Sequence, residues 1–194
     1  MRDVALLGAR LVLGGYLAVH GAQKLFGAFG GSGLEKAGAG FERIGLTPGK
    51  PMAALAGATE LGGGLLTATG VADPGGPLAI MGAMSVAATT HRANGPLAAN
   101  RGFELPLTNL AAAAALAAAG PGRLRLGPGL PRRLTVLGAL AGGVMSAVSL
   151  TKMLTASASP AGQPAPAAAP AAPSASAPTS ASSGNGQPRE SAAT

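Results

Sequence analysis

The chain has 194 residues, of which 47% are hydrophobic, 11% carry a formal charge and none is Cys or Trp. Soluble domains usually carry about 25% charged residues, so this composition excludes an ordinary water-soluble domain. The lack of Cys excludes disulfides, thiolate metal sites and a cysteine nucleophile. The net charge is +7, but aromatic residues make up only 3% and interleave with no basic run. We therefore expect no nucleic-acid partner.

Long apolar segments follow one another along the chain, and the stretch between Lys50 and His91 contains only Glu60 and Asp73 as charged residues. A membrane-spanning helix needs about 20 mostly apolar residues. These segments show no alternation of apolar and polar residues, which disfavours strands. The sequence therefore predicts an all-α membrane protein in a lipid bilayer, with spans at Val4–Leu25, Pro51–Ala72, Gly76–Thr90, Phe103–Gly120 and Leu134–Leu154.

The chain divides into three predicted parts. Residues 1–122 hold four spans, and a Gly-rich loop is expected between the first two. Residues 123–155 hold an Arg-rich loop and a fifth transmembrane helix. Residues 156–194 are rich in Ala, Pro and Ser and contain no Leu, Ile, Val or Phe. A segment with so little to bury is expected to be a disordered tail.

Small residues recur every fourth position in the predicted spans, which favours close packing between membrane helices. These repeats are Gly14 and Ala18; Ala54, Ala58 and Gly62; Ala79, Ala83 and Ala87; and Gly138, Gly142 and Ser146.

The orientation follows from the loop after the fourth span, which holds Arg123, Arg125, Arg132 and Arg133 and no acidic residue. Basic loops remain in the cytoplasm, so the N-terminus is predicted to be cytoplasmic as well. With five spans, the tail would then lie outside.

The segment His20-Gly21-Ala22-Gln23-Lys24-Leu25-Phe26-Gly27 closes the first span, and Thr59-Glu60-Leu61-Gly62-Gly63-Gly64-Leu65-Leu66 lies in the second. This pair resembles the DoxX family of small bacterial integral membrane proteins. The similarity runs from about Arg10 to Gly122 and includes His91 and Gly102-Phe103-Glu104. The fifth span and the tail depart from the common family pattern.

The resemblance implies a DoxX-like four-helix transmembrane bundle in the bacterial plasma membrane. The family takes its name from a subunit of a thiosulfate:quinone oxidoreductase. The resemblance therefore implies that this chain is a quinone-linked subunit of a membrane redox complex, with other membrane or redox proteins as partners. Fold transfers between relatives more safely than reaction, so the sequence does not decide whether the chain is an enzyme.

Polar residues gather on one side of the predicted membrane domain, where the first span ends, the second begins, the third ends and the fourth begins. Tyr16, His20 and Gln23 or Lys24 share one helix face by their spacing. The candidate ligand-binding residues are His20, Gln23, Lys24, Glu60, His91 and Glu104.

Glu60 is the leading catalytic candidate, with His20 beside it. An ionised carboxylate inside a membrane costs about 3 kcal/mol, so Glu60 should be protonated, paired with Lys24 or His20, or open to water. It could accept a proton beside a quinone, or it could simply link two helices.

Haem is not expected, because it would need His20 and His91 to face one cavity, and His91 lies at a helix end beside Arg92, where it is expected to anchor the helix at the membrane interface. No His-x-x-x-His or Glu-x-x-His motif is present, so no metal site is expected either. Lys24, Arg92, Arg101 and Arg10 are expected to extend to lipid headgroups.

Two alternatives to the redox subunit stay open at this point. The chain could be a non-enzymatic membrane scaffold that binds other helices or a second copy of itself. It could also be a carrier of protons or a small solute through its polar half.

Overall fold

The computed structural model describes residues 1–131, 133–140, 147 and 151, and within these ranges the chain contains helices and no strand. The long helices are α1 (Arg2–Phe26), α3 (Gly49–Thr69), α4 (Gly75–Thr90) and α5 (Glu104–Ala119). Shorter elements are α2 (Gly33–Arg43) and the 3-10 turns Ala28–Gly30, Arg92–Asn94 and Ala98–Asn100. The first four predicted spans therefore coincide with α1, α3, α4 and α5 to within three residues at each end, which confirms the helical class.

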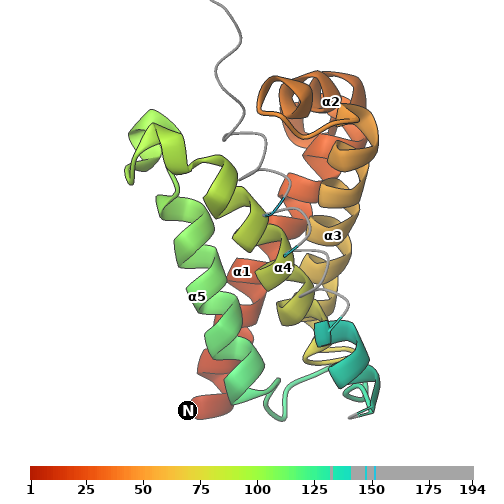
Figure 1. Ribbon diagram of the computed structural model, residues 1–194. Helices are drawn as coiled ribbons and strands as arrows, with labels where there is room; N and C mark the ends of the chain where they lie inside the picture. The colour runs from red at the N-terminus through yellow and green to blue at the C-terminus, as the bar shows by residue number, and fades with distance from the viewer. Residues whose placement is uncertain (132, 141–146, 148–150, 152–194) are drawn as a thin grey trace, which may run out of the picture. The chain divides into compact units, whose positions relative to one another are not determined.

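The long helices pack in the order α1, α3, α4, α5, while α2 lies across the end of α1 and α3 (Figure 1). The chain turns sharply at Gly27 and Gly70, which end α1 and α3 with φ of 69° at each position. Glycine accepts this left-handed conformation without a steric penalty. The buried apolar core between the helices comprises Leu13, Leu17, Ile80, Met84, Ala113 and Leu116.

Glycines allow α1 and α3 to touch through their backbones. A methyl group added at Gly14 would lie 2.5 Å from the carbonyl oxygen of Gly64, and one added at Gly64 would lie 2.5 Å from the carbonyl oxygen of Gly14. One added at Gly21 would lie 2.5 Å from the carbonyl oxygen of Gly57. This is the close approach through small residues by which membrane helices associate.

The predicted small-residue repeats are only partly in contact. Gly14 and Ala18 do face α3, because a methyl group added at Gly64 would meet the backbone of both residues. On α3, however, the buried side holds Ala53, Gly57 and Gly64, not the predicted Ala54, Ala58 and Gly62. The packed stripe is therefore displaced by one or two residues, because Ala and Gly are so frequent that spacing alone does not fix the face.

The loop expected between the first two spans contains α2, which the sequence did not predict. This helix carries charged residues on its exposed side, where Lys50 from the start of α3 pairs with Glu35. Its buried Gly38 packs against the backbone of Lys50, so that α2 fits tightly over the end of α3.

Arg10 was expected to extend to lipid headgroups, but the structure contradicts this expectation, because Arg10 is only 2% exposed. Its Nε donates to the carbonyl of Thr67 at 3.0 Å, and its Nη2 donates to that of Ala68 at 3.0 Å. Its Nη1 donates to the carbonyls of Pro121 and Leu124. The last carbonyls of a helix lack partners within the helix, so a guanidinium group is a suitable donor for the end of α3.

The segment after α5 is fixed to the turn between α3 and α4 by backbone hydrogen bonds. The amides of Leu126 and Leu130 donate to the carbonyls of Thr69 and Asp73 at 3.0 and 2.8 Å. Burial raises the pKa of the Asp73 carboxyl group, and the nearby Arg10 and Arg125 oppose this rise.

Residues 133–140 are helical and form the start of the predicted fifth span, whereas most of Leu134–Leu154 lies outside the described residues. The predicted tail, residues 156–194, lies wholly outside them. Of the described helices, α1 alone is both long and apolar enough to cross a membrane, and α5 is apolar but shorter.

The glycine contact between α1 and α3 leads to a prediction. Replacing Gly64 with Ala should destabilise the protein by about 2 kcal/mol, because a well-packed contact has no room for the methyl group. Gly62, on the same helix, has no atom within 4 Å of an added methyl group. Replacing Gly62 with Ala should be neutral or stabilise the helix by up to about 1 kcal/mol. Thermal unfolding in mild detergent would compare them, and equal shifts for both variants would contradict the proposed contact.

Candidate functional site

A cavity of about 620 Å³ extends along α4 between α1, α3 and α5. Most of its wall is apolar, with a small number of polar side chains facing into it. Among the polar residues at its wall are His20, Lys24, Glu60 and His91. Ligand sites typically combine a mostly apolar cavity with a few polar groups that orient the ligand.

Three residues of the polar face predicted for the first span lie at this cavity. Tyr16, His20 and Lys24 lie one helical turn apart on α1, and all three line the cavity. The rings of Tyr16 and His20 meet edge to face, with centroids 4.5 Å apart and planes at 82°. This contact holds the imidazole of His20 on the cavity side of α1.

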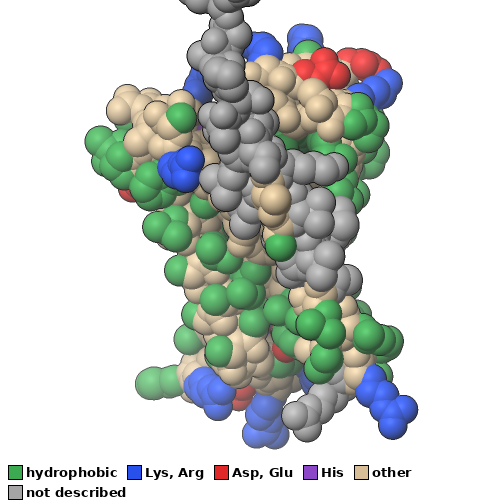
Figure 2. All heavy atoms as spheres, in the orientation of Figure 1, with side chains coloured by type: hydrophobic (Ala, Val, Ile, Leu, Met, Phe, Trp, Pro, Cys, Tyr) green, Lys and Arg blue, Asp and Glu red, His purple; other side chains and the backbone are tan. Residues whose placement is uncertain are grey.

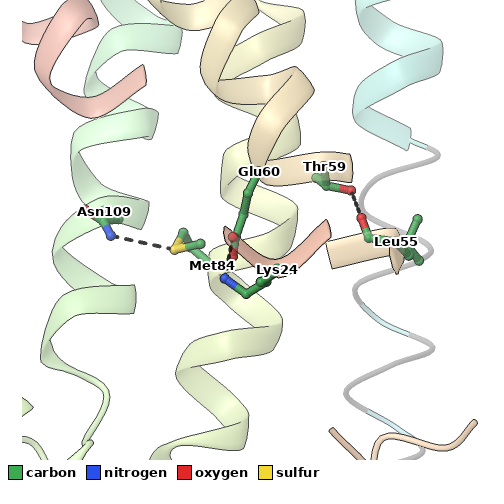
Figure 3. A network of polar contacts seen from close by, with 6 residues as sticks. All are labelled: Lys24, Leu55, Thr59, Glu60, Met84 and Asn109. Atoms are coloured by element: carbon green, nitrogen blue, oxygen red, sulfur yellow. Dashed lines mark hydrogen bonds and ion pairs between the residues drawn. The ribbon is translucent and has the colours of Figure 1, made fainter. Parts of the chain in front are cut away.

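The Lys24 ammonium group and the Glu60 carboxylate form an ion pair between α1 and α3 (Figure 3). The Nζ to Oε2 distance is 2.6 Å, and Glu60 is only 7% exposed. Of the three environments expected for Glu60, the structure therefore shows pairing with Lys24. It also corrects the expectation that Lys24 extends to lipid headgroups.

The glycine contact between the helices explains why these two side chains meet. A methyl group added at Gly57, one turn before Glu60, would lie 3.3 Å from Cβ of Lys24 and 2.8 Å from Cγ of Leu25. Only a residue without a side chain lets α1 pass this close to α3. The glycines thus bring the stem of Lys24 alongside α3, and its amine reaches the carboxylate one turn further on.

Asn109 faces the same cavity from α5, and it was not among the predicted site residues. Its amide Nδ2 donates to Sδ of Met84 on α4 at 3.9 Å (Figure 3). Thioether sulfur is a weak acceptor, so this amide is available to a ligand with a better one. An Asn within a helix made mainly of Ala and Leu was the available signal, and it had been interpreted only as a link between helices.

Two predicted binding residues lie outside the cavity wall. Gln23 donates to the carbonyl of Phe29 at 3.5 Å, in the turn that follows α1. Glu104 accepts a hydrogen bond from the amide of Ala98 at 2.8 Å, in the turns that precede α5. The structure therefore brings together His20, Lys24, Glu60 and His91, and gives Gln23 and Glu104 local contacts in turns.

Ligands for a metal do not cluster in the part of the chain that the structure describes. No three His, Asp or Glu side chains there lie close enough to hold one ion together. The polar groups at the cavity wall can instead donate or accept hydrogen bonds and exchange protons with a ligand.

Comparison with known proteins identifies one family. Residues 5–93 match the DoxX family model, and this range covers nearly all of α1 and the helices up to the end of α4. The resemblance noted in the sequence is thereby confirmed. No curated protein and no solved structure matches the chain.

The ion pair at the cavity wall gives a stability prediction. Replacing Lys24 with Met leaves the Glu60 carboxylate buried without a partner, which should cost on the order of 3 kcal/mol of unfolding free energy. Replacing both residues with Met removes the uncompensated charge, so the double variant should recover much of this loss.

The exposed Lys50–Glu35 pair supplies the matched control. Its side chains are 57% and 79% exposed, so water already screens the attraction and Lys50→Met should change stability little. Unfolding of all four proteins would be followed in the same detergent. A double variant no more stable than Lys24→Met would contradict a coupled pair.

Proposed function

Residues 5–93 form a DoxX domain, and on this premise we propose that the chain is a multi-pass membrane protein whose cavity binds a quinone or a similar lipophilic redox carrier. It would act as a subunit of a redox complex in the bacterial plasma membrane. The observation that carries the proposal is the buried Lys24–Glu60 pair at the wall of a largely apolar cavity.

The distribution of surface side chains supports membrane insertion of α1, α3 and α5, and α4 packs against both α3 and α5. Large apolar residues are exposed on α1, α3 and α5, including Val12 at 73%, Leu65 at 52% and Leu105 at 52%. In Figure 2, apolar atoms lie along the middle of the described surface, and charged side chains gather mainly toward its two ends. The 16-residue α4 and α5 measure roughly 24 Å each, so their flanking turns would complete the crossing of an apolar layer about 30 Å thick.

The proposed orientation places the N-terminus in the cytoplasm. Arg2 donates to the carbonyl of Ala119 at 3.0 Å, and Asp3 accepts from the amide of Arg123 at 3.0 Å. The N-terminus and the Arg-rich segment after α5 therefore share one end of the helices. The positive-inside rule assigns that end to the cytoplasm. If residues 134–154 form a fifth span, the tail lies outside.

The chemistry proposed for the cavity follows from its polar groups. The Lys24 ammonium can donate to a quinone carbonyl, and Glu60 or His20 can relay protons to it. Reduction of a quinone to a quinol consumes two electrons and two protons. The electrons would come from a partner subunit, while this chain would hold the ring and exchange the protons.

Glu60→Gln tests the proposal. This variant keeps the size of the side chain but removes the negative charge that fixes Lys24. We expect quinone recovered from protein in native lipid discs to fall at least about tenfold, since hydrogen bonds to charged groups contribute about 1.5–3 kcal/mol. Electron transfer to quinone in membranes should fall with it. Organic extraction followed by mass spectrometry measures the quinone.

Glu35→Gln is the control, because Glu35 is a glutamate at an exposed position of α2 and does not line the cavity. It should retain the quinone. A wild-type protein that carries no quinone, or a Glu60→Gln variant that carries as much as the wild type, would contradict the proposal. Those outcomes would favour the scaffold or the carrier.

The membrane topology can be tested separately, because the chain contains no Cys. Single cysteines at Ser32 and Arg123 would lie on opposite sides of the membrane. A membrane-impermeant maleimide added to intact spheroplasts should label Ser32→Cys at once and Arg123→Cys only after lysis. The reverse pattern would contradict the orientation, and labelling of both from outside would contradict the multi-pass arrangement.

A further inference from the structure

The charged and histidine side chains of the cavity lie toward one end, together with apolar residues of α2 and α5, whereas the other end is almost wholly apolar. The cavity is bordered by His91 at the end of α4 and by Gly75 at its start, so it follows the whole length of that helix. His20, Lys24 and Asn109 face it in the half nearer to His91. Beside Gly75, the wall consists of Leu78 and of residues that follow α5.

The residues after α5 form what we call the distal wall, which comprises Leu130, Leu134, Thr135 and Gly138. Backbone hydrogen bonds fix the start of this segment, since the amide of Leu130 donates to the carbonyl of Asp73 at 2.8 Å. The hydroxyl group of Thr135 donates to the carbonyl of Pro131 at 3.4 Å, just before the start of its own helix. The distal wall therefore presents a mainly apolar surface to the cavity.

The distal wall lies outside the residues that match the family model, which end at residue 93. The cavity is therefore completed by a segment that follows the matched residues. The polar half comes mainly from α1 and α3 of the matched domain, whereas the apolar end depends on this later segment.

From this gradient of polarity we infer that the ligand is an amphiphile with a single hydrophobic chain. Its polar head lies at the Lys24–Glu60 pair, and its chain follows α4 to the distal wall. A polar ligand without a chain would leave the apolar end unfilled, whereas a purely apolar one would bury the ion pair without compensation. The inference rests on the proposed function in that the head is taken to be a quinone ring.

Photolabelling with a designed probe tests this placement. The probe is a benzoquinone with a decyl chain and a diazirine near the end of that chain, added to the full-length protein in lipid discs. After irradiation, we expect adducts on the peptides that contain Leu130 and Leu134. Excess decyl-benzoquinone without the diazirine should suppress these adducts, which separates binding in the cavity from labelling through the lipid.

Two variants of the same helix sharpen the test. Leu134→Trp fills the apolar end and should lower the suppressible labelling about tenfold, which corresponds to about 1.4 kcal/mol. Leu137→Trp adds the same side chain at a similarly exposed position that does not line the cavity, so labelling should persist. Because both changes lie in one short helix, a general loss of folding would affect them alike, and thermal unfolding would reveal it.

The outcomes separate this inference from the proposed function. Suppressible adducts confined to α2 and the start of α3 would overturn the inference about the chain, while a quinone would still bind in the cavity. Equal labelling of Leu134→Trp and Leu137→Trp would also overturn it. The absence of any suppressible adduct would overturn both the inference and the proposed function.

Discussion

The backbone contact between α1 and α3 is the constraint on which the candidate site depends. Gly14 faces Gly64, and Gly21 faces Gly57, so each glycine provides the space that the opposite helix occupies. In lipid, helices gain little from burying apolar side chains against each other, and close van der Waals contact takes that role. The same contact sets the separation at which Lys24 reaches Glu60, so one geometric feature serves both packing and the candidate chemistry.

Charge inside the helices is accommodated in two different ways. Glu60 is neutralised by the opposite charge of Lys24, and the pair remains beside a cavity that a ligand could enter. Among the described residues, Arg10 donates to no carboxylate, and its guanidinium group donates instead to the backbone carbonyls that end α3 and follow α5. The first arrangement can respond to a bound molecule, whereas the second binds together parts of the backbone that would otherwise lack partners.

The sequence predicted those features of the fold that depend on composition and on residues close together along one helix. The long helices, the polar face of α1 and the need of Glu60 for a partner all follow from composition and from the helical period. The partners of Arg10, the position of Asn109 opposite α1 and the distal wall depend on contacts between distant segments, which spacing does not encode. Helix α2 was missed because its glycines indicated a loop, although its packing over α3 stabilises it.

The hydrogen bonds of Arg10 also have a consequence for biosynthesis. Its acceptors at Pro121 and Leu124 lie 111 and 114 residues further along the chain. At about 5–20 residues per second, a ribosome needs roughly 6 to 23 seconds to reach them. During that interval the nascent N-terminal helix carries a guanidinium group that has not yet met all of its acceptors. The hydrogen bonds of Arg10 on α1 are therefore completed late in the assembly of this protein, only after the segment that follows α5 has been synthesised.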